Sequence, residues 1–429
     1  MKFSQYDYLA FCKNGSAVLV NTFNSNYVKI NKKEDLEHFV KLYNFEIQLD
    51  ENDEMVKSLY ERGFIVDDET DEYELAQKDV LKHLSKNDKV FELVLYVTDQ
   101  CNFRCVYCPV SYNNDKFSDE NWEALYKHVE KGIISGEYEV IHISFFGGEP
   151  LLEVDKILSF LEKLNTLMQK YPHVKFTHEI TTNGYFLTPE IYDKLVNFNV
   201  IYYQITVDGF AETHDKMRPL IGGQGTWNKI IENLKYINTK KDNTQFVLRA
   251  NYNKTNMNTL EEYKEWQKKT FDNPKFRFLY NPVVSYSDNV PEEQLADVES
   301  EETQAVEKKI KDGSKIFKKY SGVCHVAFKH CYTISTDGNI SKCDNLHGSR
   351  NDIYIGKLSK NGDFIFNEDI NVWREGFELE ECRDCLIYPL CCARCCPLKK
   401  VKYPQERPDC YMVKEEWTEK IKSFLENDI

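Results

Sequence analysis

Three features are missing from this sequence of 429 residues, and each absence excludes a class of protein. No apolar run approaches the roughly 18 residues that a membrane-spanning helix needs, so we expect no membrane association. Residues 1–20 carry no signal-peptide pattern, which predicts a cytoplasmic protein. An excess of positive charge is also missing. The formal net charge is −15, so the phosphates of a nucleic acid would be repelled and we expect no nucleic-acid partner.

Cysteine, by contrast, is abundant, with 14 residues in the chain. Residues 101–108 read CNFRCVYC and place Cys101, Cys105 and Cys108 in the pattern C-x3-C-x2-C, directly after an apolar, strand-like run. Three thiolates on one loop can hold three irons of a cubane cluster, whereas electron carriers use four cysteines. The fourth iron then keeps an open position, as a catalytic metal site does. Zinc is the alternative for this loop, but a zinc site needs a fourth ligand from elsewhere.

A glycine-rich turn follows the next apolar run, where residues 145–150 read FFGGEP. Glycine lets the backbone approach a ligand closely because it has no Cβ atom. The carboxylate of Glu149 can accept hydrogen bonds from an ammonium group. Such a turn is common by itself, and its position after the cysteine loop is what makes the pair of motifs specific.

Together, the two motifs resemble those of radical S-adenosylmethionine (SAM) enzymes, which prefer an aromatic residue, here Tyr107, before the third cysteine. The resemblance implies a 4Fe-4S cluster whose open iron is chelated by SAM. It also implies reductive cleavage of SAM to a 5′-deoxyadenosyl radical, with an electron from an external one-electron donor such as flavodoxin or ferredoxin. In the same way it implies that Gly147, Gly148 and Glu149 contact the amino group of SAM.

Apolar, β-branched runs alternate with helix-like stretches through the central part of the chain. The runs occupy residues 91–97, 139–146, 175–181, 200–207, 245–250 and 276–280. This alternation predicts βαβ units and a parallel sheet in an α/β protein. Six such units resemble the partial (β/α)6 TIM-like barrel of radical SAM enzymes. Active sites in such barrels collect at the carboxyl ends of the strands, where both motifs fall.

Two further strand ends carry candidate SAM-site residues. The TTNG segment includes Asn183, and the TVDG segment includes Thr206 and Asp208. By the resemblance, Thr206 and Asp208 face the SAM ribose and the substrate. Asn183 is a candidate too, although an Asn-Gly pair after a strand also makes a simple turn. The HDKMRP segment at residues 214–219 is assigned a structural role.

The C-terminal third carries most of the remaining cysteines, and their spacing resembles the SPASM extension of radical SAM enzymes that modify peptides and proteins. The resemblance implies two auxiliary 4Fe-4S clusters, and thus three clusters in all. The first auxiliary cluster would take Cys324, Cys331, Cys343 and Cys395. The second would take Cys382, Cys385, Cys391 and Cys410. Full ligation by thiolates leaves no open iron, which favours electron transfer at these clusters.

Two alternatives stay open in this region. The doublets Cys391-Cys392 and Cys395-Cys396 allow a second ligand register, one residue later. We take the first register because it keeps five residues between Cys385 and Cys391. Disulfides are another use for so many cysteines, but disulfide scaffolds are normally small and secreted.

Residues 1–85 begin with three strand-like runs, and helix-like stretches follow. They resemble the winged-helix-like precursor recognition element of peptide-modifying enzymes. That element binds the leader of a ribosomally made peptide by adding it as a strand to a sheet edge. A structural cap on the barrel is the alternative. We therefore expect four parts: the recognition element at 1–85, the barrel at 86–285, a linker at 286–322 and the SPASM domain at 323–429.

Asp344 directly follows a predicted cluster ligand, Cys343. It resembles the proposed base of sulfatase-maturing relatives, which would take a proton as the substrate radical is oxidised. An aspartate that merely forms a turn is the alternative.

These patterns favour a radical SAM/SPASM maturase that installs a crosslink in a ribosomally synthesised precursor peptide. The crosslink would be a thioether or a carbon–carbon or carbon–oxygen macrocycle. An anaerobic sulfatase-maturing enzyme, which generates formylglycine, is the first alternative, and the extension at residues 1–85 counts against it. A non-catalytic iron–sulfur or zinc scaffold is the second, and the GGEP turn and the three-cysteine loop count against it.

Overall fold

The computed structural model describes residues 1–11, 15–108, 113–283, 295–296, 324–344, 353–375 and 382–391. Contacts divide the chain into two compact units. The first unit comprises residues 1–87, 312–329 and 371–429, and the second comprises residues 88–311 and 330–370.

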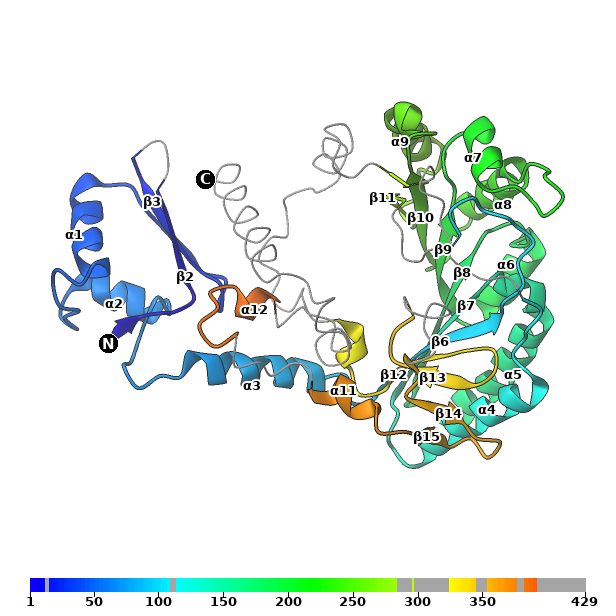
Figure 1. Cartoon of the computed structure of the whole chain (residues 1–429), viewed down its shortest axis with the longest axis horizontal. Helices are drawn as coiled ribbons and strands as arrows, with labels where there is room; N and C mark the ends of the chain where they lie inside the picture. The colour runs from blue at the N-terminus through cyan, green and yellow to red at the C-terminus, as the bar shows by residue number, and fades with distance from the viewer. Residues whose placement is uncertain are drawn as a thin grey trace. The chain divides into compact units, whose positions relative to one another are not determined.

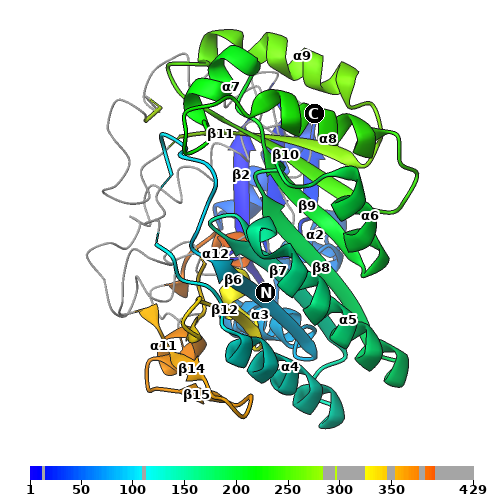
Figure 2. The same cartoon turned by 90° about the vertical axis from the view of Figure 1, so that its right-hand side faces the viewer.

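Six parallel strands form the centre of the second unit, side by side in chain order (Figure 1). They are β6 (Val90–Thr98), β7 (Val140–Gly147), β8 (Lys175–Thr182), β9 (Val200–Thr206), β10 (Gln245–Tyr252) and β11 (Phe276–Pro282). The connecting helices are α4 (Asp119–Ile134), α5 (Val154–Lys170), α6 (Pro189–Asn197), α7 (Ala211–Met217), α8 (Trp227–Asn238) and α9 (Leu260–Thr270). Two short 3-10 helices, η1 (Pro150–Glu153) and η2 (Met257–Thr259), precede α5 and α9. Figure 2 shows α4, α5 and α6 covering one face of the parallel strands.

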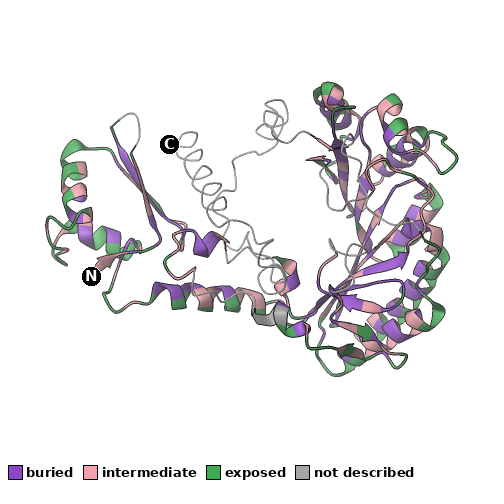
Figure 3. Ribbon diagram, in the orientation of Figure 1, coloured by how far each residue is buried: buried purple, intermediate pink, exposed green. Residues whose placement is uncertain are grey.

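Burial alternates along these strands because successive side chains point to opposite faces of a sheet. In β7, Ile141, Ile143 and Phe145 are buried, and the residues between them are partly exposed. The helices bury apolar residues at helical spacing, such as Ile157 and Leu161 of α5. Figure 3 shows this division, with purple strands and helices that are purple on one side and green on the other. The face of the parallel strands opposite these helices is therefore the one available for a functional site.

The partial parallel barrel that we expected from the sequence is confirmed. Each predicted strand overlaps an observed one, as 91–97 overlaps β6 and 276–280 overlaps β11. β-branched and aromatic runs bounded by turn residues locate such strands because these side chains suit a pleated, buried surface.

The barrel sheet continues beyond β6 into the cysteine-rich region. Strand β12 (Cys331–Ile334) pairs in parallel with β6, and three antiparallel strands follow it. These are β13 (Asn339–Ser341), β14 (Gly356–Leu358) and β15 (Phe364–Phe366). Residues 330–370 therefore group with the barrel, whereas we expected them in a separate domain at 323–429. The difference arises because β12 takes the hydrogen-bonding edge of β6.

The first unit contains a three-stranded antiparallel sheet in the order β2-β3-β4. Its elements are β1 (Lys2–Phe3), β2 (Asp7–Phe11), β3 (Ala17–Asn21), β4 (Tyr27–Ile30), α1 (Lys33–Tyr43), α2 (Glu54–Glu61), β5 (Ile65–Val66), α3 (Glu72–Ser85), η4 (His325–Ala327) and α12 (Tyr388–Cys391). Leu19, Phe39, Leu42, Val56 and Phe64 form the centre of the core of the first unit. In helix α11 (Ile370–Glu375) the first residue is assigned to the second unit and the others to the first. Within the described ranges, no helix is both long and apolar enough to cross a membrane.

Candidate active site

The cysteine loop begins where β6 ends, at the carboxyl edge of the parallel strands. Cys101, Cys105 and Cys108 are free thiols and half-buried. A backbone hydrogen bond of 3.1 Å from Cys108 N to Cys105 O closes a turn between the last two. Burial raises the pKa of Cys101 to about 11 and that of Cys105 to about 12. A coordinated metal would overcome this preference for the neutral thiol, because it deprotonates a coordinating thiol.

The donor chemistry of the loop fits an iron–sulfur cluster with one open iron, since three thiols lie on one short segment. Among the described residues, no three His, Cys, Asp or Glu side chains stand in an arrangement that could hold a metal ion. The loop supplies suitable donors, and binding a cluster would require the three thiols to turn toward a common centre.

The end of α7 and the segment after it hold the cysteine loop in place. Three backbone hydrogen bonds join them: Arg104 N to Pro219 O at 2.8 Å, Val106 N to Met217 O at 3.0 Å and Ile221 N to Asn102 O at 3.0 Å. The first two bonds involve the HDKMRP segment. They give that segment a structural role in fixing the loop.

The side chain of Tyr107 connects the cysteine loop to the ends of β9 and β10. Its hydroxyl donates to Asp208 Oδ2 and accepts from Arg218 Nη1 at 2.8 Å and from Asn251 Nδ2 at 3.0 Å. Arg218 Nη1 also lies 3.8 Å from Asp208 Oδ2. Asp208, Arg218 and Asn251 are buried. We call these four side chains the Tyr107 network.

Asp208 carries the negative charge of the Tyr107 network. Burial raises its pKa, and the Arg218 guanidinium and the hydrogen bond from Tyr107 oppose that rise. Its second oxygen, Oδ1, accepts from Asn251 N at 2.6 Å. Both carboxylate oxygens therefore bind groups of the protein, which fixes the orientation of the side chain. A contact between Asp208 and the SAM ribose stays a prediction.

Glu149, in the GGEP turn, is fully buried. Its Oε1 accepts from Thr182 Oγ1 at 2.6 Å and from Leu151 N at 3.0 Å, and its Oε2 accepts from Asn183 N at 2.7 Å. Burial raises its pKa, and these hydrogen bonds lower it. The carboxylate thus connects the turn after β7 to the turn after β8. A contact between the GGEP turn and the SAM amino group stays a prediction. While the carboxylate of Glu149 keeps these hydrogen bonds, the backbone of the turn would have to make that contact.

Gly147 and Gly148 bring the GGEP turn against the end of β6. A Cβ atom on Gly147, whose φ is +132°, would lie 2.3 Å from Thr98 O. A Cβ atom on Gly148 would lie 2.2 Å from Gln100 O. Hydrogen bonds of 2.8 Å from Gly148 N to Thr98 O and from Glu149 N to Gln100 O hold the two loops together. Only glycine permits this approach, because any Cβ atom would overlap backbone.

Asn183 and Thr206 lie at the neighbouring strand ends. Asn183 Nδ2 donates to Asn102 Oδ1 at 2.8 Å, which connects the turn after β8 to the cysteine loop. Gly184 follows it with a φ of +80°, so the Asn-Gly pair does form a turn. Thr206 is the last residue of β9 and is partly exposed. The predicted SAM-site residues therefore collect at one edge of the sheet.

Residues 95–266, which include the cysteine loop, the GGEP turn and the Tyr107 network, match the family model described as the radical SAM superfamily. The chain carries a radical SAM domain. Members of this superfamily are enzymes, and the family implies a 4Fe-4S cluster and SAM as cofactors.

Relatives of this radical SAM enzyme include two with stated activities. The cysteine-type anaerobic sulfatase-maturating enzyme of Clostridium novyi (strain NT) is 24% identical over 376 residues, which is 79% of this chain and 94% of the relative. The radical SAM cyclopropyl synthase TigE of Paramaledivibacter caminithermalis is 26% identical over 170 residues, 35% of this chain and 34% of the relative. The second similarity therefore covers only part of each protein.

A solved structure supports the fold of the radical SAM enzyme. Native anSMEcpe with bound AdoMet and Cp18Cys peptide has a TM-score of 0.52 and 20% sequence identity. The match covers 79% of this chain and 99% of that one. At this identity the likeness shows the architecture, and the substrate must be argued separately.

The predicted auxiliary ligands are distributed over both units. Cys331, at the start of β12, and Cys343 belong to the unit that holds the radical SAM domain, and Cys324 belongs to the other unit. Cys382, Cys385 and Cys391 also belong to the first unit. Cys385 N donates to Cys382 O at 3.1 Å, the same turn that joins Cys105 and Cys108. Cys395 and Cys410 lie outside the described residues, so both ligand sets remain predictions.

Asp344 lies near the barrel strands. Its backbone carbonyl accepts a hydrogen bond of 3.2 Å from the hydroxyl of Tyr96, on β6. A catalytic role for its side chain stays a prediction.

Three residues at this site were not singled out from the sequence. Arg218 lay in a segment assigned only a structural role, and Asn102 and Asn251 were not considered. The order of TVDG and HDKMRP places Arg218 close to Asp208, which is the one sequence signal that could have identified it.

Proposed function

We propose that this radical SAM enzyme is a maturase that acts on a ribosomally synthesised precursor peptide and installs a crosslink in it. The observation that supports the peptide substrate most directly is a cationic cavity in the first unit. Two of the proteins that this chain resembles also support a peptide or protein substrate. One relative is a sulfatase-maturating enzyme, and one structural neighbour holds a bound peptide.

Bound at the cysteine loop, the 4Fe-4S cluster and SAM would supply a 5′-deoxyadenosyl radical that abstracts hydrogen from a substrate carbon. The residues of this chain would hold those groups in position. Cys101, Cys105 and Cys108 would ligate the cluster, and the GGEP backbone would orient the amino group of SAM. The Tyr107 network would hold the cysteine loop against the ends of β9 and β10, because Tyr107 is hydrogen-bonded to three buried side chains there.

The SPASM-like cysteines would hold two auxiliary clusters that accept the electron left on the substrate. Asp344 would take the accompanying proton. These assignments rest on the spacing of the cysteines and on the position of Asp344, which follows Cys343 and accepts a hydrogen bond from Tyr96 through its backbone carbonyl.

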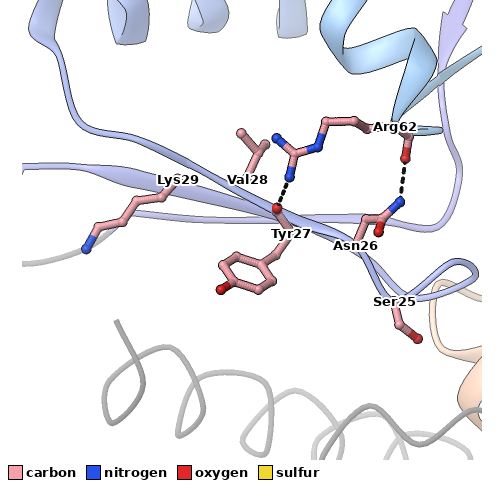
Figure 4. A pocket seen from close by; sticks show the side chains of 6 residues that line it. All are labelled: Ser25, Asn26, Tyr27, Val28, Lys29 and Arg62. Carbon is pink, nitrogen blue, oxygen red and sulfur yellow. Dashed lines mark hydrogen bonds between the residues drawn. The ribbon is translucent and has the colours of Figure 1, made fainter.

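The cavity of the first unit lies along β4, an edge strand of its sheet among the described strands, and has a volume of about 460 Å³. It is lined by Ser25, Asn26, Tyr27, Val28, Lys29 and Arg62 (Figure 4). The Arg62 guanidinium donates to the carbonyl of Tyr27, and its own carbonyl accepts from Asn26 Nδ2 at 2.8 Å. Two cations and no carboxylate are among the described lining residues, in a chain with a net charge of −15. We propose that an acidic stretch of the leader peptide docks here.

Leader docking can be measured by fluorescence anisotropy with a labelled precursor peptide. Replacement of Arg62 with Glu should weaken binding about tenfold or more, since a like charge opposes the acidic stretch. Lys57→Glu, on the exposed side of α2, is the matched control and should bind normally. Equal affinity for both variants would remove the cavity from leader recognition.

Sulfatase maturation is the second candidate, because the similarity to a sulfatase-maturating enzyme covers most of both chains. The reconstituted enzyme should be incubated with SAM, a reductant and either a candidate precursor peptide or a sulfatase-derived peptide. A product that lacks two hydrogen atoms, keeps its sulfur and resists aldehyde reagents supports the crosslink. A product with an aldehyde supports formylglycine formation instead.

A further inference from the structure

A second cavity lies on the solvent side of the cysteine loop. It has a volume of about 360 Å³ and is lined by Gln100, Cys101, Asn102, Arg104, Asn113, Asn114, Leu152 and Ile221. It therefore reaches a predicted cluster ligand, Cys101, directly from the protein surface. The Tyr107 network and the buried carboxylate of Glu149 are not among its described lining residues, so it is separate from the groups that face the barrel.

The charge of this cavity differs from that of the chain. Its described lining residues include one cation, Arg104, and no carboxylate, although the chain has a net charge of −15. Arg104 Nη1 donates to Cys101 O at 2.9 Å and to Phe103 O at 2.7 Å, so its positive charge is fixed over the loop. Fixed charges contribute more to recognition than flexible ones because less side-chain entropy is lost on binding.

An apolar anchor stands beside the fixed charge. The side chain of Ile221 is 61% exposed, while its backbone nitrogen bonds to Asn102 O at 3.0 Å and so belongs to the loop assembly. An exposed aliphatic residue next to a cation and several amides has the composition of a small protein contact, with an apolar centre and a polar rim.

We propose that this surface, which we call the Arg104 surface, docks the acidic one-electron carrier protein that reduces the cluster. The inference rests on the radical SAM chemistry of the proposed function. In the docked complex one electron passes from the reduced carrier to the cluster, and the carrier leaves oxidised by one electron, with no proton transferred. Dissociation of the oxidised carrier frees the surface for the next electron.

A carrier fits the Arg104 surface better than the peptide substrate does. The substrate must reach the radical within the barrel, whereas an electron carrier needs only the outer side of the loop. Local positive charge would also attract an acidic carrier that the rest of this acidic chain repels, and such steering acts mainly on the association rate.

The test uses the reconstituted holoenzyme and a reduced flavodoxin as the carrier. Ile221→Asp adds a negative charge to the Arg104 surface without removing the hydrogen bonds of Arg104, and Arg104→Gln removes the fixed cation. Lys235→Glu, on the exposed side of α8, is the matched charge change elsewhere on the same unit. Flavodoxin binding is measured by titration at low and high salt. Cluster reduction is followed by absorbance with flavodoxin and, separately, with dithionite, which needs no docking surface.

We expect Ile221→Asp and Arg104→Gln to weaken flavodoxin binding about 3–10-fold at low salt, and the difference to shrink at high salt. The ratio of the flavodoxin-driven to the dithionite-driven reduction rate should fall by a similar factor, and Lys235→Glu should leave it unchanged. The proposal is overturned if the two variants bind flavodoxin as the wild type does, if both reduction rates fall in proportion, or if the precursor peptide competes for the surface. None of these measurements requires a modified peptide, so a failure of the proposed maturase activity would be seen separately.

Discussion

At the scale of single residues, the site is organised by buried carboxylates that bind the protein rather than solvent. The motifs predict that Glu149 and Asp208 contact SAM, and in the structure all of their carboxylate oxygens accept hydrogen bonds from other groups of the protein. Their partners could not be found from the sequence, because Tyr107 stands 101 positions from Asp208 and Thr182 stands 33 positions from Glu149. Local patterns identify which residue types gather at strand ends, and only the fold pairs them.

Replacement of Glu149 with Gln tests this structural role. The amide nitrogen would face either Asn183 N or the Thr182 and Leu151 donors, so at least one hydrogen bond would become a donor–donor contact. We expect the free energy of unfolding of the barrel to fall by about 1–3 kcal/mol. Urea unfolding followed by tryptophan fluorescence measures this change. Glu179→Gln, on the partly exposed face of β8, is the control, and an equal loss in both variants would contradict the expectation.

Asp7 is a residue whose ionisation should affect the stability of the first unit. Its Oδ1 accepts from Asn21 Nδ2 at 2.8 Å, while its Oδ2 is buried without a hydrogen-bond partner among the described residues. Burial, with the nearby charge of Glu72, raises the pKa of Asp7 to about 8 from an ordinary value of 3.8. The folded state therefore binds the proton more tightly than the unfolded state does. The resulting stabilisation is complete below pH 3.8 and is lost as the pH rises to about 8.

Asp7→Asn should remove this pH dependence, because the amide stays neutral. At pH 8 the variant should be more stable than the wild type by more than about 1 kcal/mol, and near pH 4 the two should be nearly equal. Pulse proteolysis across a urea series, scored on fragments of the first unit, gives both stabilities. If the stabilities of the variant and the wild type changed in parallel over this pH range, ionisation of Asp7 would cost the folded state no free energy and the expectation would be wrong.

At the scale of elements, the strands and helices of the barrel were predictable and their lateral contacts were not. The six parallel strands follow from apolar, β-branched runs between helices of amphipathic spacing. The pairing of β12 with β6 leaves no local pattern in the sequence, because the free edge of a sheet can pair with any strand of suitable length and register. The same holds for the hydrogen bond between Arg104 and Pro219, which joins two loops that no sequence pattern connects.

The contact between the GGEP turn and the end of β6 can be tested with Gly148→Ala. The new Cβ atom would lie 2.2 Å from Gln100 O, so the turn would have to move away from the cysteine loop. We expect a loss of about 3 kcal/mol or more in unfolding free energy and a lower iron content after reconstitution. Gly136→Ala is the control, since its φ is +72° and no atom lies within 4 Å of the added carbon. It should cost only about 1 kcal/mol. Normal iron content in Gly148→Ala would mean that the two loops are not coupled.

At the scale of the whole molecule, distant parts of the chain build the first unit together. The sequence predicts a recognition-element-like domain at residues 1–85, and in the structure residues 382–391 belong to the same unit as these residues. Arg383 Nη1 lies 2.9 Å from Asp71 Oδ2, and Thr22 Oγ1 donates to Leu386 O at 2.5 Å. A domain assignment based on continuous segments could not include such a contribution, because its contacts span more than 300 positions.

Tyr388 is the residue through which this long-range packing can be measured. Its ring lies 5.0 Å from that of Tyr73 on α3, and both belong to a buried cluster with Tyr6 and Ala76. Truncation to Ala would leave a cavity beside α3 and should cost about 3–5 kcal/mol. Hydrogen exchange followed by mass spectrometry should then show faster exchange in α3 and β2, with the strands β7 to β10 unchanged. Ile365→Ala, at a side chain that is 62% exposed, should change neither region. If exchange in α3 stayed at its wild-type rate, the packing of Tyr388 against α3 would contribute nothing to the stability of residues 1–87.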